Sequence, residues 1–233
     1  MTNFDSIYKR ASKRKGGAQA LELLLPPVPD RKKLESSPDS FFLEEMSRCI
    51  FRAGFSWKVV DNKWAGFKEA FYDFELNQLM ALSPEQWDNY IQDKRIIRYQ
   101  QRINAVRNNL WFVNEISTLN GGFGAFLAKW EAQNIIDLFA YLKKNGSRLG
   151  GNSGQYFLQN AGVDSFVLSG DVVTCLQGCG LDINNHPMSK KDLKLIQNTF
   201  NNFHKETGLP FIHLSMIMAY SIGDNEILLP EKR

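Results

Sequence analysis

The chain has 233 residues, of which 43% are hydrophobic, and its formal net charge is +3. A chain of this size and composition can bury a sizeable core in one domain or in two close-packed lobes. It contains no apolar run of about 18 residues, so we expect no membrane span. The slight positive charge permits a polyanionic partner without requiring one.

The first part of the chain is basic and polar. It starts with MTNFDSIYKRASKRKGG, which has no apolar signal core, and proline-rich LPPVPD follows. We expect residues 1–38 to be a loosely ordered N-terminal segment ahead of one domain over 39–233. The three cysteines, Cys49, Cys175 and Cys179, lack the spacing of a metal site. This cysteine usage is typical of a reduced, cytoplasmic protein.

Helical signals dominate the remaining sequence. Ser83, Pro84 and Gln86 supply an N-cap, a proline at the first helical position and a capping-box partner. Alternation with a period of two residues is almost absent, so we predict an all-α protein of about nine or ten helices. Apolar spacing and caps place helices at 41–53, from 84, and at 102–115, 132–144, 189–206 and 211–222.

Familiar catalytic motifs are missing. The sequence has no Walker loop, no HExxH and no GxSxG. Its three histidines, His186, His204 and His213, are too dispersed to indicate a metal site.

The stretch GSRLGGNSGQYFL, residues 146–158, places a glycine-rich turn between two predicted helices. Glycines let the backbone approach a bulky anion, and the amides that begin the next helix can bind a phosphate. A tight helix–helix connection without a ligand is the alternative. On the first interpretation, the residues that contact DNA backbone are Arg148, Gly150, Gly151, Asn152 and Ser153, with Arg98 from a basic group in mid-chain.

Four segments in order carry a family resemblance: AGFSW at 53–57, IIRYQQRINA at 96–105, the hairpin, and FVLSGDVV after it. Together they resemble the DNA-3-methyladenine glycosylase I, or Tag-type, enzymes of the helix-hairpin-helix DNA glycosylase superfamily, from about Phe41 to Asp224. The resemblance implies a two-lobed, all-α helix-hairpin-helix fold. It also implies a base excision repair enzyme that removes alkylated purines such as 3-methyladenine from double-stranded DNA. We expect a monomer.

The sequence departs from the family pattern in three places. Cys49 stands where the family has a base-contacting glutamate, eight residues before Trp57. The N-terminal tyrosines and the zinc ligands of the family have no counterparts, so we expect no zinc. A monovalent cation at the hairpin follows from the superfamily resemblance alone. A helix-hairpin-helix protein that binds DNA or RNA without catalysis is the alternative function, and an interaction module unrelated to nucleic acid is the third.

A base that leaves the DNA stack needs a flat aromatic surface to bind against. We predict that Trp57 is this surface, with Phe55, Cys49 and Tyr156 also contacting the base. The alternative for Trp57 is an ordinary core residue.

The candidate catalytic carboxylate is Asp171, which would stabilise an electron-poor sugar. Counting back from Gly180 puts the catalytic aspartate of the superfamily at Ser169, so the match is offset by two residues. The alternative is that Ser169 caps a helix and Asp171 is a first-turn acid. Gln155 stands where a bifunctional lyase would need a lysine, which favours a monofunctional glycosylase.

Overall fold

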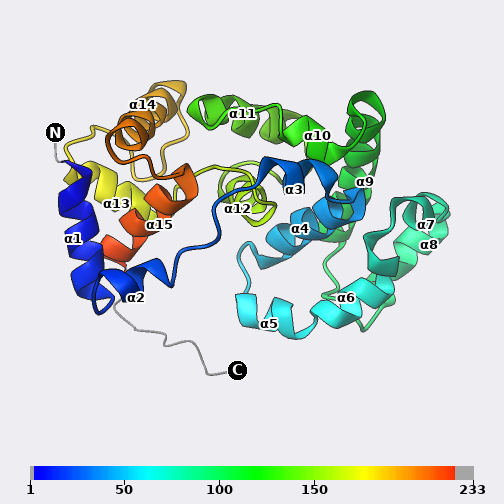
Figure 1. Cartoon of the computed structure of the whole chain (residues 1–233). Coiled ribbons are helices and arrows are strands. Elements are labelled where there is room, and N and C mark those ends of the chain that lie inside the picture. The colour runs from blue at the N-terminus through cyan, green and yellow to red at the C-terminus, as the bar shows by residue number, and fades with distance from the viewer. Residues whose placement is uncertain (1–2, 224–233) are drawn as a thin grey trace. The chain divides into compact units, whose positions relative to one another are not determined.

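The computed structural model describes residues 3–223, and within this range the chain is helical, with no strand (Figure 1). It contains 15 α-helices, more than the nine or ten predicted. Seven of them have only five to seven residues, which is too short for a helical period to show clearly in the sequence. Asp224, where the family resemblance ends, lies outside the described residues.

The described residues form two compact units, each assembled from segments that are distant in the sequence. The first unit contains residues 3–29, 132–136 and 164–223, and the second contains 30–131 and 137–163. This division differs from the single domain expected over 39–233, because the N-terminal helices join the C-terminal ones.

In the first unit, the apolar helix α15 packs against α1, α13 and α14. The rings of Phe166 and Phe200 stack beside it, with centroids 4.2 Å apart. The elements are α1 (Phe4–Arg14), α2 (Ala18–Glu22), the 3₁₀ helix η3 (Ala132–Asn134), α13 (Gly170–Gly178), α14 (Lys190–Thr207) and α15 (Phe211–Ile222).

The basic N-terminal residues have structural partners in this unit. Arg14 donates hydrogen bonds to the carbonyls of Ile222, at 2.7 Å, and Gly223. Arg10 donates to the Ser221 hydroxyl at 3.1 Å. These cations satisfy the C-terminal end of α15, where a helix carries unpaired carbonyls and partial negative charge. The segment that we expected to be loosely ordered therefore contains helices that pack on α15.

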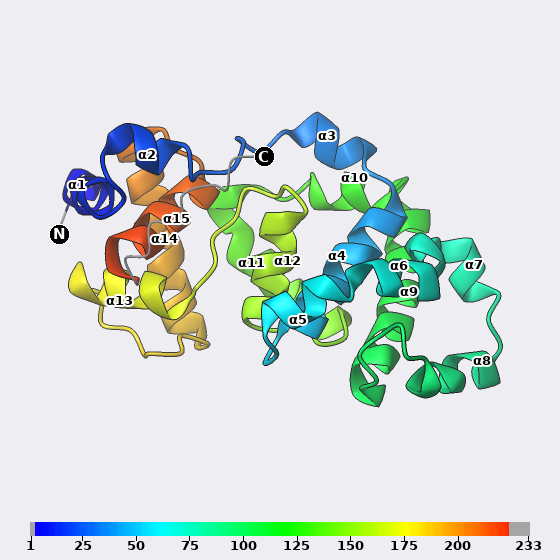
Figure 2. The ribbon, with the colours of Figure 1, turned by 90° about the horizontal axis from the view of Figure 1, so that it is seen from below.

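In the second unit, α4 lies along α9 and α12 (Figure 2). Most of α11 also belongs to this unit. The elements are α3 (Arg31–Ser36), α4 (Asp39–Arg52), α5 (Trp57–Asn62), α6 (Trp64–Ala70), η1 (Tyr72–Phe74), α7 (Leu76–Met80), α8 (Pro84–Asn89), η2 (Tyr90–Gln92), α9 (Gln100–Asn120), α10 (Phe123–Leu127), α11 (Ile135–Asn145) and α12 (Asn152–Asn160).

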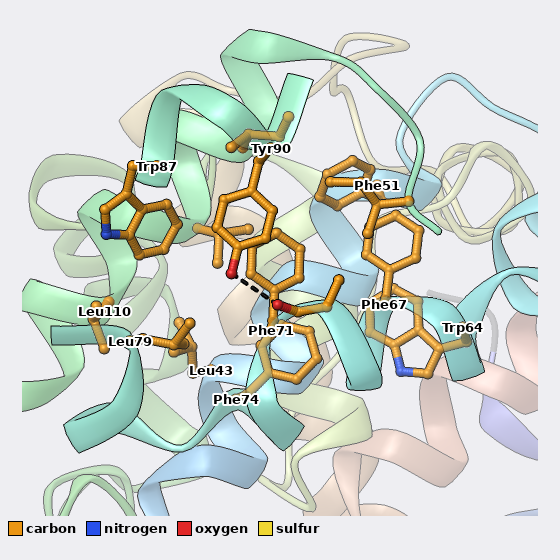
Figure 3. Close-up of a cluster of buried hydrophobic side chains, with 14 of the residues drawn as sticks. Leu43, Phe51, Trp64, Phe67, Phe71, Phe74, Leu79, Trp87, Tyr90 and Leu110 are labelled. Atoms are coloured by element: carbon orange, nitrogen blue, oxygen red, sulfur yellow. Dashed lines mark hydrogen bonds between the residues drawn. The ribbon is translucent and has the colours of Figure 1, made fainter. Parts of the chain in front are cut away.

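A cluster of buried aromatic side chains supports one side of α4 (Figure 3). The rings of Phe71 and Tyr90 stack with centroids 4.5 Å apart, and the Tyr90 hydroxyl donates to the Ala70 carbonyl at 2.8 Å. Phe51 of α4 meets Phe67 edge-on at 4.6 Å. Because Phe51 lies in the last turn of α4, this packing fixes the place where α4 ends.

Candidate functional site

A cavity of about 280 Å³ lies between α12 and the C-terminal end of α4. Small-molecule sites span roughly 300–1,000 Å³, so the cavity is near the lower end of that range. Residues three and four positions apart share a helix face, and the cavity residues of both helices follow this spacing. The cavity is lined by Cys49, Arg52, Ala53, Gly54, Trp57, Asn152, Ser153, Tyr156, Gln159 and Asn160.

Trp57, the first residue of α5, supplies the largest apolar wall. Its side chain is 47% exposed, so it is not a core residue. Tyr156 of α12 meets it edge-to-face, with ring centroids 5.3 Å apart. The Arg52 guanidinium lies 5.0 Å from the centroid of the indole and forms an ion pair with Asp61 at 2.6 Å. The site therefore combines an exposed aromatic surface with a cation whose charge is balanced.

The polar end of the cavity contains Cys49 and Asn160. The Asn160 amide nitrogen donates to Glu45 Oε2 at 3.2 Å and to Cys49 Sγ at 3.6 Å. Burial, with the nearby Glu45 carboxylate, raises the pKa of the Cys49 thiol to about 12, so the thiol is neutral at pH 7. Burial also raises the pKa of Glu45, although Arg48 at 3.3 Å opposes that shift.

Residues 146–151 form the predicted hairpin, between α11 and α12. Asn109, which is fully buried in α9, accepts from the Ser147 amide at 2.8 Å and donates to the Ser147 carbonyl at 3.0 Å. A Cβ at Gly154 would lie 2.1 Å from the Leu149 carbonyl oxygen, so only glycine fits there. Gly151 has φ +60° and also favours glycine. These contacts set the hairpin against α9 and fix where α12 begins.

The remaining predicted DNA contacts lie outside the cavity lining. Arg148 has φ +58° and donates to Gln101 of α9. Arg98 is exposed. Gly150 lies against Lys143. A Cβ added at Gly150 would be 3.3 Å from the Cγ of Lys143.

Phe55, predicted as a base contact, does not line the cavity. Its side chain is 39% exposed and lies beside Tyr99, with ring centroids 6.3 Å apart. The Arg102 guanidinium stacks over it at 4.3 Å and donates to the Phe51 and Ala53 carbonyls. Phe55 therefore belongs to an aromatic and cationic patch formed by the loop after α4 and the start of α9.

Asp171 belongs to the first unit, in the first turn of α13. The Ser169 hydroxyl accepts from the Val172 amide at 3.3 Å and caps this helix. Asp171 Oδ2 lies against Gly223, where a Cβ would be 2.7 Å away. Gln155 is buried in α12 and does not line the cavity. The catalytic role of Asp171 stays a prediction.

Four polar or charged residues at or beneath the cavity were missed in the sequence: Glu45, Arg52, Gln159 and Asn160. The signal was present as helical spacing. Glu45 and Arg52 lie four and three residues from Cys49, and Gln159 and Asn160 lie three and four residues after Tyr156.

All three cysteines are buried, and none of them forms a disulfide within residues 3–223. Across residues 3–223, no three His, Cys, Asp or Glu side chains are grouped so that they could hold a metal ion. The expectation that the protein binds no zinc stays a prediction. None of the helices in the described range is both long and apolar enough to cross a membrane.

Residues 36–181 match the model of the methyladenine glycosylase family. This region contains the whole cavity and the hairpin. No curated protein matches the chain.

Two solved structures show the same fold, and a third covers a smaller part of this chain. The 8-oxoguanine DNA glycosylase of Methanocaldococcus jannaschii has a TM-score of 0.59 at 14% identity, over 92% of each chain. An 8-oxoguanine glycosylase/lyase of that organism, in complex with DNA containing 8-oxoguanine, has a TM-score of 0.52 at 16% identity, over 93% of this chain and 88% of that one. The 3-methyladenine DNA glycosylase I of Staphylococcus aureus has a TM-score of 0.46 at 20% identity, over 56% of this chain and 84% of that one. The all-helical architecture is thus that of the helix-hairpin-helix glycosylases.

Proposed function

Because the chain belongs to the methyladenine glycosylase family and is a DNA glycosylase, we propose that it releases alkylated purines, such as 3-methyladenine, from double-stranded DNA. The observation that carries this proposal is the cavity, in which the half-exposed Trp57 shares the lining with polar residues of α12. A glycosylase must take its target base out of the duplex and bind it against a flat apolar surface.

The cavity has room for stacking but offers little acid catalysis. Its lining residues include no carboxylate, and the Cys49 thiol is a weak acid with its pKa raised to about 12. An alkylated purine that carries a positive charge needs less assistance, because its glycosidic bond is already weakened. In the proposed reaction the C1′–N bond breaks, and the cationic base leaves as a neutral molecule with the bonding electrons. Water then adds to C1′ of the sugar cation and releases a proton to the solvent.

The other predicted roles complete this proposal. The hairpin amides and Arg148 bind phosphates, which positions DNA without reading its sequence. Asp171 is the carboxylate that we assign to the charge developing on the sugar. Gln155 stands at the position where a lyase would need a lysine, which favours hydrolysis without a lyase step.

The test is release of bases from duplex DNA treated with a methylating agent, analysed by mass spectrometry. We expect free 3-methyladenine and an abasic strand that remains uncleaved. DNA binding with no released base would contradict the proposal and would support a protein that binds DNA without catalysis.

A further inference from the structure

Gln159 presents an unusual polar group at the cavity. Its side chain lines the cavity, and its amide nitrogen Nε2 is buried without a hydrogen-bond partner among the described residues. Native proteins rarely leave such a donor unpaired, because burying it without a hydrogen bond destabilises the fold. An acceptor atom on a molecule that enters the cavity would satisfy this donor.

Asn160, the next residue, is held in one orientation. Its amide nitrogen donates to Glu45 Oε2 at 3.2 Å, which places the nitrogen on that side. The same nitrogen points to Cys49 Sγ at 3.6 Å. The carbonyl oxygen of Asn160 then faces away from Glu45, and no hydrogen bond to it is found within residues 3–223.

The residues that line the cavity thus include one donor, from Gln159, and one acceptor, from Asn160. Both groups are neutral amides, so they distinguish ligands by hydrogen bonding rather than by charge. Adenine presents the complementary pair, since its exocyclic amine donates and an adjacent ring nitrogen accepts.

We propose that Gln159 and Asn160 read a donor–acceptor edge of the extruded base, and that Glu45 is the positioning residue that orients Asn160. This inference rests on the proposed function, because it takes the cavity as the site of the base. It assigns specificity to α12 and to a carboxylate one helical turn below Cys49 on α4.

Binding of free bases tests the inference without requiring catalysis. The probes are adenine and purine, which differ only in the exocyclic amine, and binding is followed by NMR titration. We expect the parent protein to bind adenine about threefold to tenfold more tightly than purine, the range for one neutral hydrogen bond. Asn160→Ala and Glu45→Ala should remove this preference. Gln159→Ala should weaken both bases by a similar factor.

Two further variants separate positioning from damage to the fold. Glu45→Gln keeps a side-chain oxygen that can accept from Asn160, so it should retain the preference that Glu45→Ala loses. Gln78→Ala, at an exposed position of α7, should change neither affinity. The melting temperature of each variant is measured to check that it folds.

The inference is overturned if the parent binds neither base, if Asn160→Ala keeps the parental preference, or if Glu45→Gln loses it as Glu45→Ala does. Its failure is distinct from that of the proposed function. A parent that prefers adenine but releases no base from methylated DNA would contradict the proposed function alone. A parent that releases bases while Asn160→Ala keeps the preference would contradict the inference alone.

Discussion

Tyr156 presents its ring at 88° to the plane of Trp57, with the two centroids 5.3 Å apart. An edge-to-face contact of this kind is a favoured aromatic geometry and limits the rotamers of both side chains. Because Trp57 is still 47% exposed, the contact orients the indole without covering it. The sequence separates the two residues by almost one hundred positions, and α4 and α12 bring them together.

Replacing Trp57 should weaken binding at an extruded base. Base–aromatic stacking is worth ~1–3 kcal/mol, so Trp57→Ala should bind DNA that contains an extruded base more weakly by a corresponding factor. Binding of undamaged duplex should change little. Fluorescence anisotropy with both DNAs measures this difference.

The matched control for that variant is Trp111→Ala. Trp111 lies on α9, is 52% exposed and does not line the cavity. An equal loss in both variants would show that Trp57 has no specific role in binding.

Arg148 should contribute one phosphate contact. Arg148→Asn removes the charge while keeping a residue type that tolerates the positive φ of 58° at this position. Affinity for all DNA sequences should fall, and the dependence of log K on log salt should become less steep by about one. Lys194→Asn, at an exposed position of α14, is the control. An unchanged salt dependence would argue against a phosphate contact at Arg148.

Asp171→Asn tests the assigned carboxylate. If Asp171 stabilises charge on the sugar, the variant should bind DNA normally and release bases more slowly, because only the transition state is affected. Asp137→Asn changes another first-turn acid, in α11, and should retain the parental rate. A parental rate in Asp171→Asn would leave that residue as a first-turn acid that favours the dipole of α13.

The Cys49 thiol should react slowly at neutral pH. With its pKa near 12, the thiolate fraction in the folded protein should rise about tenfold per pH unit from pH 7 to 10, with no plateau. In the unfolded chain the thiol ionises near pH 9. The folded state therefore holds this proton more tightly, and its stability should fall as pH rises from about 9 toward 12.

Iodoacetamide labelling of the Cys49 peptide, followed by mass spectrometry across this pH range, measures the ionisation. A plateau near pH 9 would show that the thiol of the folded protein ionises normally.

Local signals in the sequence predicted much of the fold. Ser83 and Gln86 form the predicted capping box, and Ser169 caps α13. The helix predicted over 211–222 is α15. The short helices α5 to α7 were missed, because their stability depends on the aromatic cluster around Phe71 rather than on their own pattern.

The candidate site was predicted only in part. Cys49, Trp57 and Tyr156 line one cavity, and their contact with a base stays a prediction. The bond from Asn160 to Glu45 could not be inferred, because it joins two helices whose side chains are 115 positions apart. The spacing of residues along one helix predicts which of them share a face. Tertiary packing decides which other helix that face contacts.

The most direct measurement of the central claim is single-turnover release of 3-methyladenine by a variant whose cavity is filled. Ala53 lines the cavity and is the C-cap of α4, so Ala53→Phe places a ring inside. Ala81→Phe adds the same ring at the C-cap of α7, outside the cavity. We predict that the parent and Ala81→Phe release the base at similar rates, and that Ala53→Phe loses release while still binding duplex DNA. Release at the parental rate by a folded Ala53→Phe variant would contradict the assignment of the cavity as the site of base excision.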